Sequence, residues 1–203
     1  MKVGTRSLLF GGHQFIIHPL MVALAWWRLY GIPWDPRLWV AFIVHDWGYW
    51  GKPNMDGKEG DMHIFTGAKI MGWLFDPFCK SRAGEVTHKY YVSWYCFCFY
   101  HSRTIYRRYG VPPSRLCIAD KLSWAMEPWW FFIPRTWITG ELKEYMSRAG
   151  DAKYDRENLP TDGGAIGWYK AVKQYLDTWA YDHRNIREDM PLCSVHQCSR
   201  RVG

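Results

Sequence analysis

The chain is 203 residues long, carries a formal net charge of +7 and has an aromatic content of 18%, including 14 tryptophans. This length suits one domain with a real core, or one domain with a small appendage. The positive charge favours an anionic substrate or partner. The basic residues form no long run, so the sequence does not favour nucleic acid as that partner. Because aromatic side chains bury large areas, we expect an aromatic-rich core that leaves a wide apolar pocket or interface.

Three features predict a cytoplasmic protein without a membrane partner. No apolar run approaches the roughly 18 residues that span a bilayer. The first residues lack the apolar stretch and the small residues of a signal peptide. Among the six cysteines, Cys96 and Cys98 lie in an aromatic run, where free cysteine behaves as a small hydrophobe. Reduced thiols of this kind are typical of the cytoplasm.

Helical spacing dominates the first part of the chain. Residues 1–12 are rich in glycine and are expected to form an irregular lead-in. Apolar residues then recur at helical spacing over 14–30, which predicts a first helix. Asp35 and Pro36 provide a cap and a first-turn proline for a second helix, which ends near Val44.

The remainder is also predicted to be mainly helical, because strand-type alternation is scarce. Turn-forming residues over 48–60 predict a long loop, and a loop of this length is often functional. Further helices are expected from near Asp61, from Glu85 to about His101, after Pro112-Pro113-Ser114, over 140–150 and over 165–182. We expect an all-α fold with a metal-binding helical domain (1–140), a C-terminal helical extension (141–187) and a polar tail (188–203).

A histidine and an aspartate, His45 and Asp46, stand side by side at the end of the second predicted helix. Imidazole nitrogen and carboxylate oxygen are both good ligands for a divalent metal. A lone His-Asp pair is weak evidence, and a single histidine is more often a core or surface residue. The signal becomes stronger because other polar residues lie in similarly apolar surroundings: His18, His63, His101 and Asp120.

These residues and their neighbours resemble the motifs of the HD-domain superfamily, an all-helical family of metal-dependent phosphohydrolases. The resemblance covers roughly residues 13–127, and it does not extend beyond about residue 140. The matching segments, in the family's order, are 18–23 (HPLMVA), 44–49 (VHDWGY), 63–71 (HIFTGAKIM), 100–102 (YHS) and 119–122 (ADKL). The resemblance therefore implies an HD-type helical bundle with a C-terminal helical extension.

The resemblance also implies a ligand set. It places metal ligands at His18, His45, Asp46 and Asp120, and in members with two metals it adds His63 and His101, with Asp46 bridging. Four histidines and two aspartates are more than one ion needs, and two ions can clamp the attacking and leaving oxygens of a phosphoester. Nitrogen and oxygen ligands suit Mn, Fe, Co, Ni, Mg or Zn. His13 remains an alternative to His18.

Charged residues near these motifs are candidates for handling the substrate. Lys52, Arg103 and Lys121 are expected to hold phosphate oxygens, and Glu59 to position water or a leaving-group proton. A salt-bridged pocket rim is the alternative for each of them. The Trp-rich segment 124–137 is expected to serve as a lid that stacks on the substrate, as an interface of a homo-oligomer, or as plain core.

Three functions fit such a site. The first is hydrolysis of a nucleotide or another small phosphoester by a metal-activated water. The second is a di-iron oxygenase acting on a small polar substrate, because some HD-type proteins, such as myo-inositol oxygenase, hold two irons with the same six-ligand pattern. The third is a catalytically silent nucleotide-binding module. Loss of a ligand usually marks such modules and none is lost here, so we expect the hydrolase.

Overall fold

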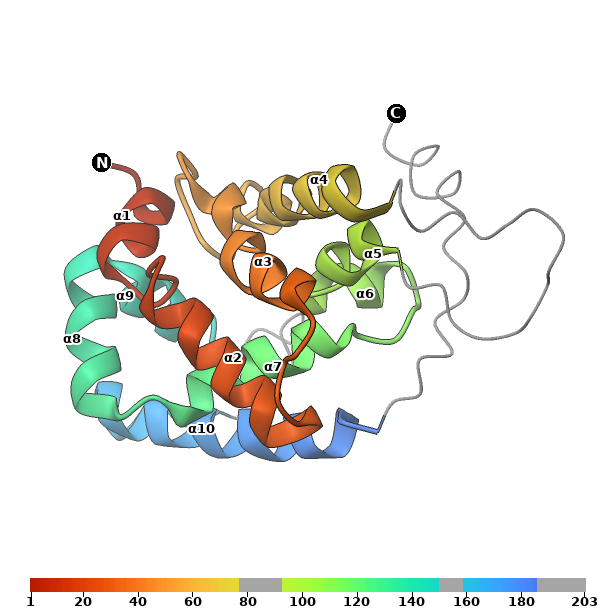
Figure 1. Cartoon of the computed structure of the whole chain (residues 1–203). Coiled ribbons are helices and arrows are strands. Elements are labelled where there is room, and N and C mark those ends of the chain that lie inside the picture. Colours follow the sequence, from red (N-terminus) through yellow and green to blue (C-terminus); the bar gives the residue numbers. More distant parts are fainter. Residues whose placement is uncertain (77–92, 150–158, 186–203) are drawn as a thin grey trace, which may run out of the picture.

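The computed structural model describes residues 1–76, 93–149 and 159–185, arranged as in Figure 1. Every regular element among these residues is a helix, so the predicted all-α class is confirmed. The α-helices are α1 (Val3–Phe10), α2 (Ile17–Tyr30), α3 (Pro36–Val44), α4 (Ile64–Phe75), α5 (Trp94–Phe99), α6 (Arg103–Arg108), α7 (Arg115–Met126), α8 (Trp129–Thr139), α9 (Glu141–Ser147) and α10 (Gly164–His183). Two short 3-10 helices, η1 (Trp47–Tyr49) and η2 (Gly60–His63), lie between α3 and α4.

Helices α2 and α7 form the centre of the arrangement. They pack against each other, and α10 runs along the base of Figure 1 against α7. Helix α4 packs against both α3 and α5, and α5 in turn contacts α7. At the other end of the molecule, α1 and α9 pack against α8. Segments from the beginning, middle and end of the chain thus meet around α7.

Local capping sets where the first helices begin. The side chain of Asp35 accepts a hydrogen bond from the backbone N–H two residues later, which confirms the predicted start of α3. The side-chain oxygen of Gln14 accepts from two backbone N–H groups, the second being that of Ile17 at 2.7 Å. Helix α2 therefore begins at Ile17 rather than at residue 14, and His18 lies in its first turn.

The predicted lead-in over residues 1–12 is wrong, because residues 3–10 form α1. A Cβ on Gly4 would lie 2.3 Å from the carbonyl oxygen of Tyr49, and the Gly4 N–H donates to the carbonyl of Lys52 at 3.0 Å. Glycine at this position allows a helix to approach the chain after α3 closely. It does not mark a loop.

The helix predicted from Glu85 to about His101 also needs correction. Residues 85–92 lie outside the described residues, and the described part is the short helix α5, capped by Ser93. His101 follows the end of α5, and a separate helix, α6, begins at Arg103. The break places His101 at a helix end, in the same way that His45 ends α3.

Two glycines let the chain around α4 approach the end of α3. A Cβ on Gly48 would lie 1.8 Å from the carbonyl oxygen of His63, and a Cβ on Gly67 would lie 2.7 Å from the Cα of His45. No larger residue fits at these distances without moving the backbone. The two glycines therefore bring the end of α3 and the end of η2 together.

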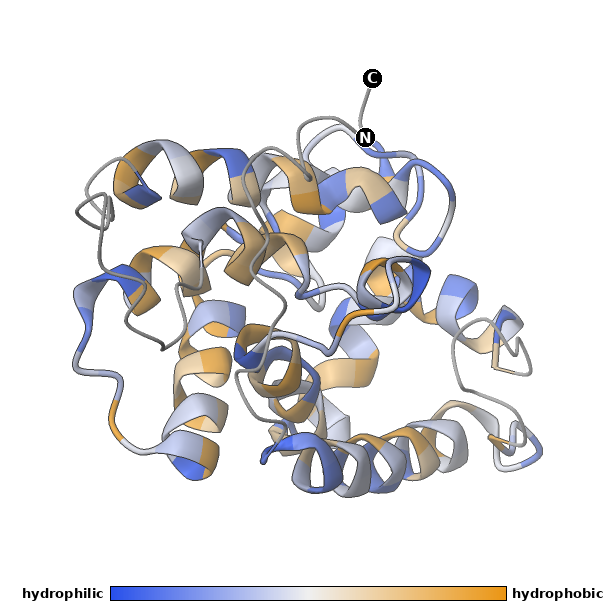
Figure 2. Ribbon diagram, turned by 90° about the vertical axis from the view of Figure 1, so that its right-hand side faces the viewer, coloured by the Kyte–Doolittle hydropathy of each residue, from blue (hydrophilic) through white to orange (hydrophobic). Residues whose placement is uncertain are grey.

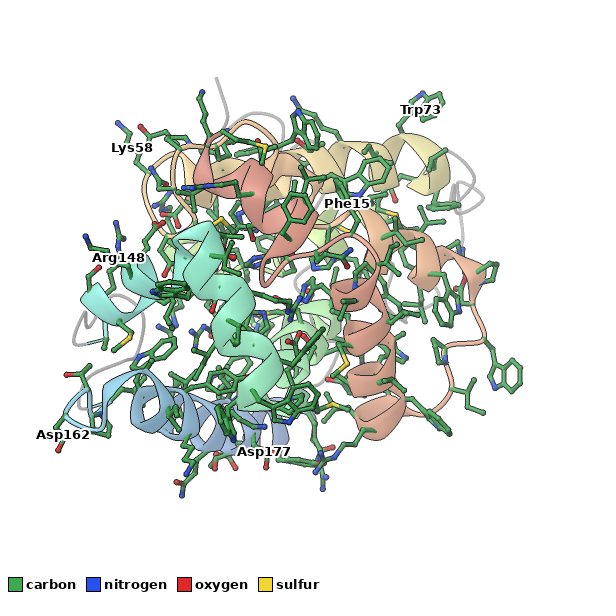
Figure 3. All side chains as sticks on the ribbon, turned by 90° about the vertical axis from the view of Figure 1, so that its left-hand side faces the viewer. Phe15, Lys58, Trp73, Arg148, Asp162 and Asp177 are labelled. Atoms are coloured by element: carbon green, nitrogen blue, oxygen red, sulfur yellow. The ribbon has the colours of Figure 1, made fainter. Side chains whose placement is uncertain are left out.

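Aromatic residues are shared between the core and the surface. Hydrophilic residues interrupt the hydrophobic ones along the helices in Figure 2, as expected where each helix has one face in the core. Within the Trp-rich segment, Trp124 and Phe132 are buried, whereas Trp130 and Trp137 are exposed. Figure 3 shows Trp73 projecting away from α4. None of the described helices combines the length and the apolar character required to cross a membrane.

Candidate metal centre

Six polar side chains from distant parts of the chain meet in the interior, and each is at most 6% exposed. His18 lies in the first turn of α2, His45 and Asp46 follow α3, His63 ends η2, His101 follows α5, and Asp120 lies in the middle of α7. All six were predicted as ligands from the sequence. Burial of so many polar groups is costly unless each finds a partner.

Three of the histidines are held in one orientation by their own backbone. The Nδ1 atoms of His45, His63 and His101 each lie within hydrogen-bond distance of the carbonyl oxygen three residues earlier, at 3.0, 2.6 and 2.5 Å. Because a carbonyl oxygen only accepts, Nδ1 carries the proton, and the Nε2 of the neutral ring presents a lone pair. Metal-ligating histidines are oriented in this way by a hydrogen bond from the other ring nitrogen.

The Nε2 atoms converge. His63 Nε2 lies 3.0 Å from His101 Nε2, and His18 Nε2 lies 3.3 Å from His45 Nε2. Two lone pairs at this separation repel each other unless a proton or a metal cation lies between or beside them. The donor set thus fits a cation.

The carboxylates complete two buried clusters: His18, His45, Asp46 and Asp120 in the first, and Asp46, His63 and His101 in the second. Oδ2 of Asp46 lies 3.2 Å from His18 Nε2 and 3.1 Å from His45 Nε2. Its other oxygen, Oδ1, lies 3.6 Å from His63 Nε2 and 3.4 Å from His101 Nε2. Asp46 therefore gives one oxygen to each cluster.

Two of the carboxylate oxygens are poorly satisfied by the protein. Asp46 Oδ2 and Asp120 Oδ1 are buried, and neither accepts a well-formed hydrogen bond from the described residues. Both lie 3.2 Å from His18 Nε2. Unsatisfied buried carboxylate oxygens are rare in native proteins and require an explanation, and a divalent cation at this point provides one.

The electrostatics of the clusters follow from burial and from the facing charges. Burial lowers the pKa of His18, but the carboxylates of Asp120 and Asp46 outweigh it and raise that pKa to about 9. Burial likewise raises the pKa of Asp46, but nearby histidines, His45 foremost, hold it well below the usual range. For His63, burial and the neighbouring His101 lower the pKa well below the usual range. The carboxylates therefore stay ionised, and His18 carries a proton that a metal cation would have to displace.

His13 faces the same clusters from a second network. Its Nε2 lies 3.9 Å from Asp46 Oδ2, outside both ligand groups. Its Nδ1 lies 3.0 Å from Ser7 Oγ, and the Ser7 hydroxyl donates to Glu141 Oε1 at 2.6 Å. The structure therefore favours His18 over His13 as the ligand, and it fixes His13 with Nε2 toward the clusters.

Glu141 anchors this second network at the start of α9. Its carboxylate is fully buried and also accepts hydrogen bonds from the backbone N–H of Gly12 and from the hydroxyls of Thr139 and Tyr145. Burial raises its pKa, but hydrogen bonds from His13, Ser7 and Thr139 outweigh that effect and lower it. Glu141 was not predicted from the sequence, because its partners Ser7 and His13 are more than a hundred residues away and no local pattern marks them.

A pocket opens beside the clusters, with about 540 Å³ of empty space, part of it open to solvent. Lys121 lines it and donates a hydrogen bond to Asp120 Oδ2 at 2.7 Å. Arg103 also lines it, is only 8% exposed and contacts the hydroxyl of Tyr175 at 3.4 Å. The structure thus brings two of the predicted phosphate-binding cations to one pocket.

The other two predicted substrate residues lie elsewhere. Glu59 is exposed, and its carboxylate accepts a hydrogen bond from Asn54 at 2.8 Å, which is the main reason that its pKa is lowered. Lys52 is half-buried in the loop after η1, where its backbone contacts Gly4. Neither residue lines the pocket, so their catalytic roles stay predictions.

Tyr49 is a further residue of the site that the sequence motif contained but that the prediction did not use. Its ring stacks on His63, with centroids 3.9 Å apart and planes 10° from parallel, and it lines the pocket. Burial, with the charge of Asp46, raises its pKa well above the usual range, so the hydroxyl stays protonated. The ring holds His63 in place against the carbonyl that orients it.

Comparisons with known proteins add no family to this geometry. No protein-family model matches the chain, and neither curated proteins nor solved structures give a significant match. The all-helical fold and the two buried His/Asp clusters are compatible with an HD-type site. The resemblance to that superfamily lies in the sequence motifs.

Proposed function

We propose that this protein is a metal-dependent phosphohydrolase that cleaves a nucleotide or another small phosphoester. The observation that carries the proposal is the division of Asp46 between two buried clusters, one oxygen to each. The proposal includes two further points: that the fold is the HD-type helical bundle implied by the motifs, and that the six predicted ligands bind the metal. The net charge of +7 supports an anionic substrate.

The residues that hold the metals follow from the two clusters. One ion would be held by His18, His45, Asp46 and Asp120, and a second by Asp46, His63 and His101. Two such ions, of Mn, Fe, Co, Ni, Mg or Zn, supply Lewis-acid activation of a water and neutralise charge on a phosphoryl group.

The remaining side chains of the site bind and orient the substrate. Lys121 and Arg103 present cations to phosphate oxygens from the wall of the pocket. Lys121 also holds Asp120 through Oδ2, which leaves Oδ1 directed toward His18. His13, held by Ser7 and Glu141, presents Nε2 to whatever lies beside Asp46.

The test is metal content followed by turnover. Protein purified without added metal is analysed by elemental mass spectrometry, then reconstituted with each divalent metal and assayed for phosphate release from a panel of phosphoesters. We expect about two ions per chain and metal-dependent phosphate release. About two irons per chain with substrate-dependent oxygen uptake, and no phosphate release, would replace the hydrolase by the di-iron oxygenase. If the protein retained metal and bound a nucleotide but released no phosphate, the catalytically silent nucleotide-binding module would replace the hydrolase.

Two kinds of partner are proposed, a substrate and a second copy of the chain. The substrate is a small anion, and self-association through the exposed part of the Trp-rich segment remains a prediction, with Trp130 and Trp137 as the exposed residues. Sedimentation of the wild type beside a Trp130→Ser/Trp137→Ser variant tests it. A wild type that sediments as a monomer would end this prediction.

A further inference from the structure

One side of α2 is apolar and yet exposed. Ile16, just before the helix, and Leu20, Leu24 and Trp27 within it are 43–67% exposed. Their spacing of four, four and three residues places them in one stripe along the helix. Because a surface helix normally turns polar residues to solvent, an exposed stripe of this kind requires an explanation.

Helix α3 continues this apolar surface. It packs against α2 through Trp26 and Phe42, whose ring centroids lie 5.7 Å apart. Trp39 and Ile43 are one turn apart on the outer side of α3 and are 42% and 45% exposed. The exposed stripes of the two helices therefore lie beside their contact.

An apolar hollow joins the two stripes. It is lined by Phe15, Ile43, Trp47 and Trp50, with about 590 Å³ of empty space, part of it open to solvent. Between centroids, the Phe15 ring lies 6.5 Å from that of Trp47 and 6.2 Å from that of Trp50. Figure 3 shows Phe15 near the beginning of α2. We call the two stripes and this hollow the α2–α3 face.

The α2–α3 face is large enough for a stable interface. Trp47 and Trp50 are 40% and 59% exposed. At roughly 200 Å² for a fully exposed large side chain, these two and the six residues of the stripes offer on the order of 800 Å² of apolar surface. A standard interface buries about 800 Å² on each partner, whereas the largest apolar patch of a typical monomer covers about 300–600 Å². The area therefore matches one half of an interface between folded proteins.

The charges of this region are neutralised within the chain. The Arg, Lys, Asp and Glu residues between positions 14 and 50 are Arg28, Asp35, Arg37 and Asp46. Asp35 pairs with Arg37 at 2.7 Å, Arg28 pairs with Asp177, and Asp46 lies in the metal clusters. Helices that bind membrane surfaces place Lys and Arg beside the apolar side, and this region does not. A neutral, apolar protein surface matches it better, and a second copy of the face is such a surface.

We propose that the α2–α3 face is the interface of a homodimer. In a two-fold pair, the α2 stripe of each copy packs against the hollow of the other, so that one patch serves both copies, as an isologous interface requires. Exposed tryptophans at the edge of a hollow are typical anchors of such contacts. The same elements carry His18, His45 and Asp46 on their inner side, so the second copy covers the outer side of the metal centre. None of the exposed residues of the face lines the pocket beside the clusters.

Sedimentation velocity over a range of concentrations tests the interface. We expect the wild type to sediment at twice the chain mass of 24.1 kDa. Trp27→Ser/Trp50→Ser removes two exposed anchors and should weaken self-association about a hundredfold or more. Trp130→Ser/Trp137→Ser removes two exposed tryptophans from α8 instead, so it is the matched control and should keep the dimer.

A second face variant guards against loss of the fold. Leu24 is 43% exposed, so Leu24→Glu leaves its charge in water in the monomer, whereas a two-fold interface brings two such charges together. We expect a monomer that keeps the helical circular dichroism of the wild type. The same spectrum shows that the two tryptophan variants are folded.

Three results would overturn the proposal. The first is a wild type that stays monomeric at every concentration, and co-sedimentation of that monomer with vesicles of phosphatidylcholine and phosphatidylserine would assign the face to a lipid surface. The second is a dimer that persists in either folded face variant. The third is loss of the dimer in the α8 control. None of these readouts uses phosphate release, so the interface and the proposed function are tested separately.

Discussion

Glu141 and Asp46 are both buried carboxylates that face His13, and the protein surrounds them in opposite ways. The oxygens of Glu141 accept hydrogen bonds from Ser7, Gly12, Thr139 and Tyr145. Oδ2 of Asp46 accepts no well-formed hydrogen bond and lies near the Nε2 atoms of His18 and His45, of which His45 already has its Nδ1 bonded to a backbone carbonyl. The difference indicates that the Glu141 network is complete within the chain, whereas the Asp46 clusters are arranged for a ligand that the chain does not itself provide.

The largest effect expected from this contrast is on metal binding. Asp46→Ala removes the only side chain common to both clusters, so we expect loss of both ions by elemental mass spectrometry and loss of phosphate release. Asp177→Ala, at an exposed ion pair with Arg28, is the matched control and should keep both ions. Full metal content and activity in Asp46→Ala would show that the ligand assignment is wrong.

Removing a ligand from one cluster only should have half that effect. His63→Ala takes a nitrogen from the second cluster and leaves the first intact, so the metal content should fall from about two ions per chain to about one. His183→Ala, which removes an imidazole bonded to a backbone carbonyl on α10, controls for loss of a histidine elsewhere. Loss of both ions in His63→Ala would mean that the clusters do not bind independently.

The Glu141 network should respond in stability rather than in metal ligation. Glu141→Gln replaces a charged acceptor of several hydrogen bonds by a neutral amide, which is expected to cost about 3 kcal/mol in the free energy of unfolding. Urea denaturation of the metal-free protein measures it. A loss below about 0.5 kcal/mol, the usual range for a surface substitution, would contradict the structural role of this network.

The same carboxylate predicts a pH dependence. The pKa of Glu141 is lowered on folding from its usual 4.5, so its contribution to stability is complete above the unfolded pKa and is lost as the pH falls toward the folded pKa. The stability difference between wild type and Glu141→Gln should therefore shrink as the pH falls below about 4.5, measured by urea denaturation at each pH. A difference that grew on acidification would have the wrong sign.

The smallest effect is expected at Glu59. Its side chain is exposed and bonded to Asn54, outside the pocket lining, so the structure gives Glu59→Gln little reason to alter turnover. We expect kcat/KM within about twofold of wild type, since surface substitutions usually change free energies by less than about 0.5 kcal/mol. A loss of a hundredfold or more would restore the catalytic role that the sequence suggested.

The contrast also explains what the sequence could and could not predict. Five of the six residues of the His/Asp clusters stand at or near helix ends, as His45 does after α3, whereas Asp120 lies in the middle of α7. All six follow the order of the HD-domain motifs, and this order is what led to their prediction. Glu141 was missed because its partner Ser7 is 134 residues away and carries no local signal. Helix α1 was missed because Gly4, which permits close packing, resembles a loop residue in sequence. The sequence contains 14 tryptophans and gives no signal that distinguishes Trp168, which the fold places in the lining of the pocket.

The most direct measurement is anomalous diffraction from crystals of the protein soaked in Mn²⁺. The two-cluster geometry predicts two peaks about 3.5–4 Å apart, as in two-metal sites, with a different oxygen of Asp46 bound to each. One peak should lie among His18, His45 and Asp120, and the other between His63 and His101. Saturating Mn²⁺ that gave no peak beside Asp46, or peaks only elsewhere, would contradict the metal centre and the function proposed from it.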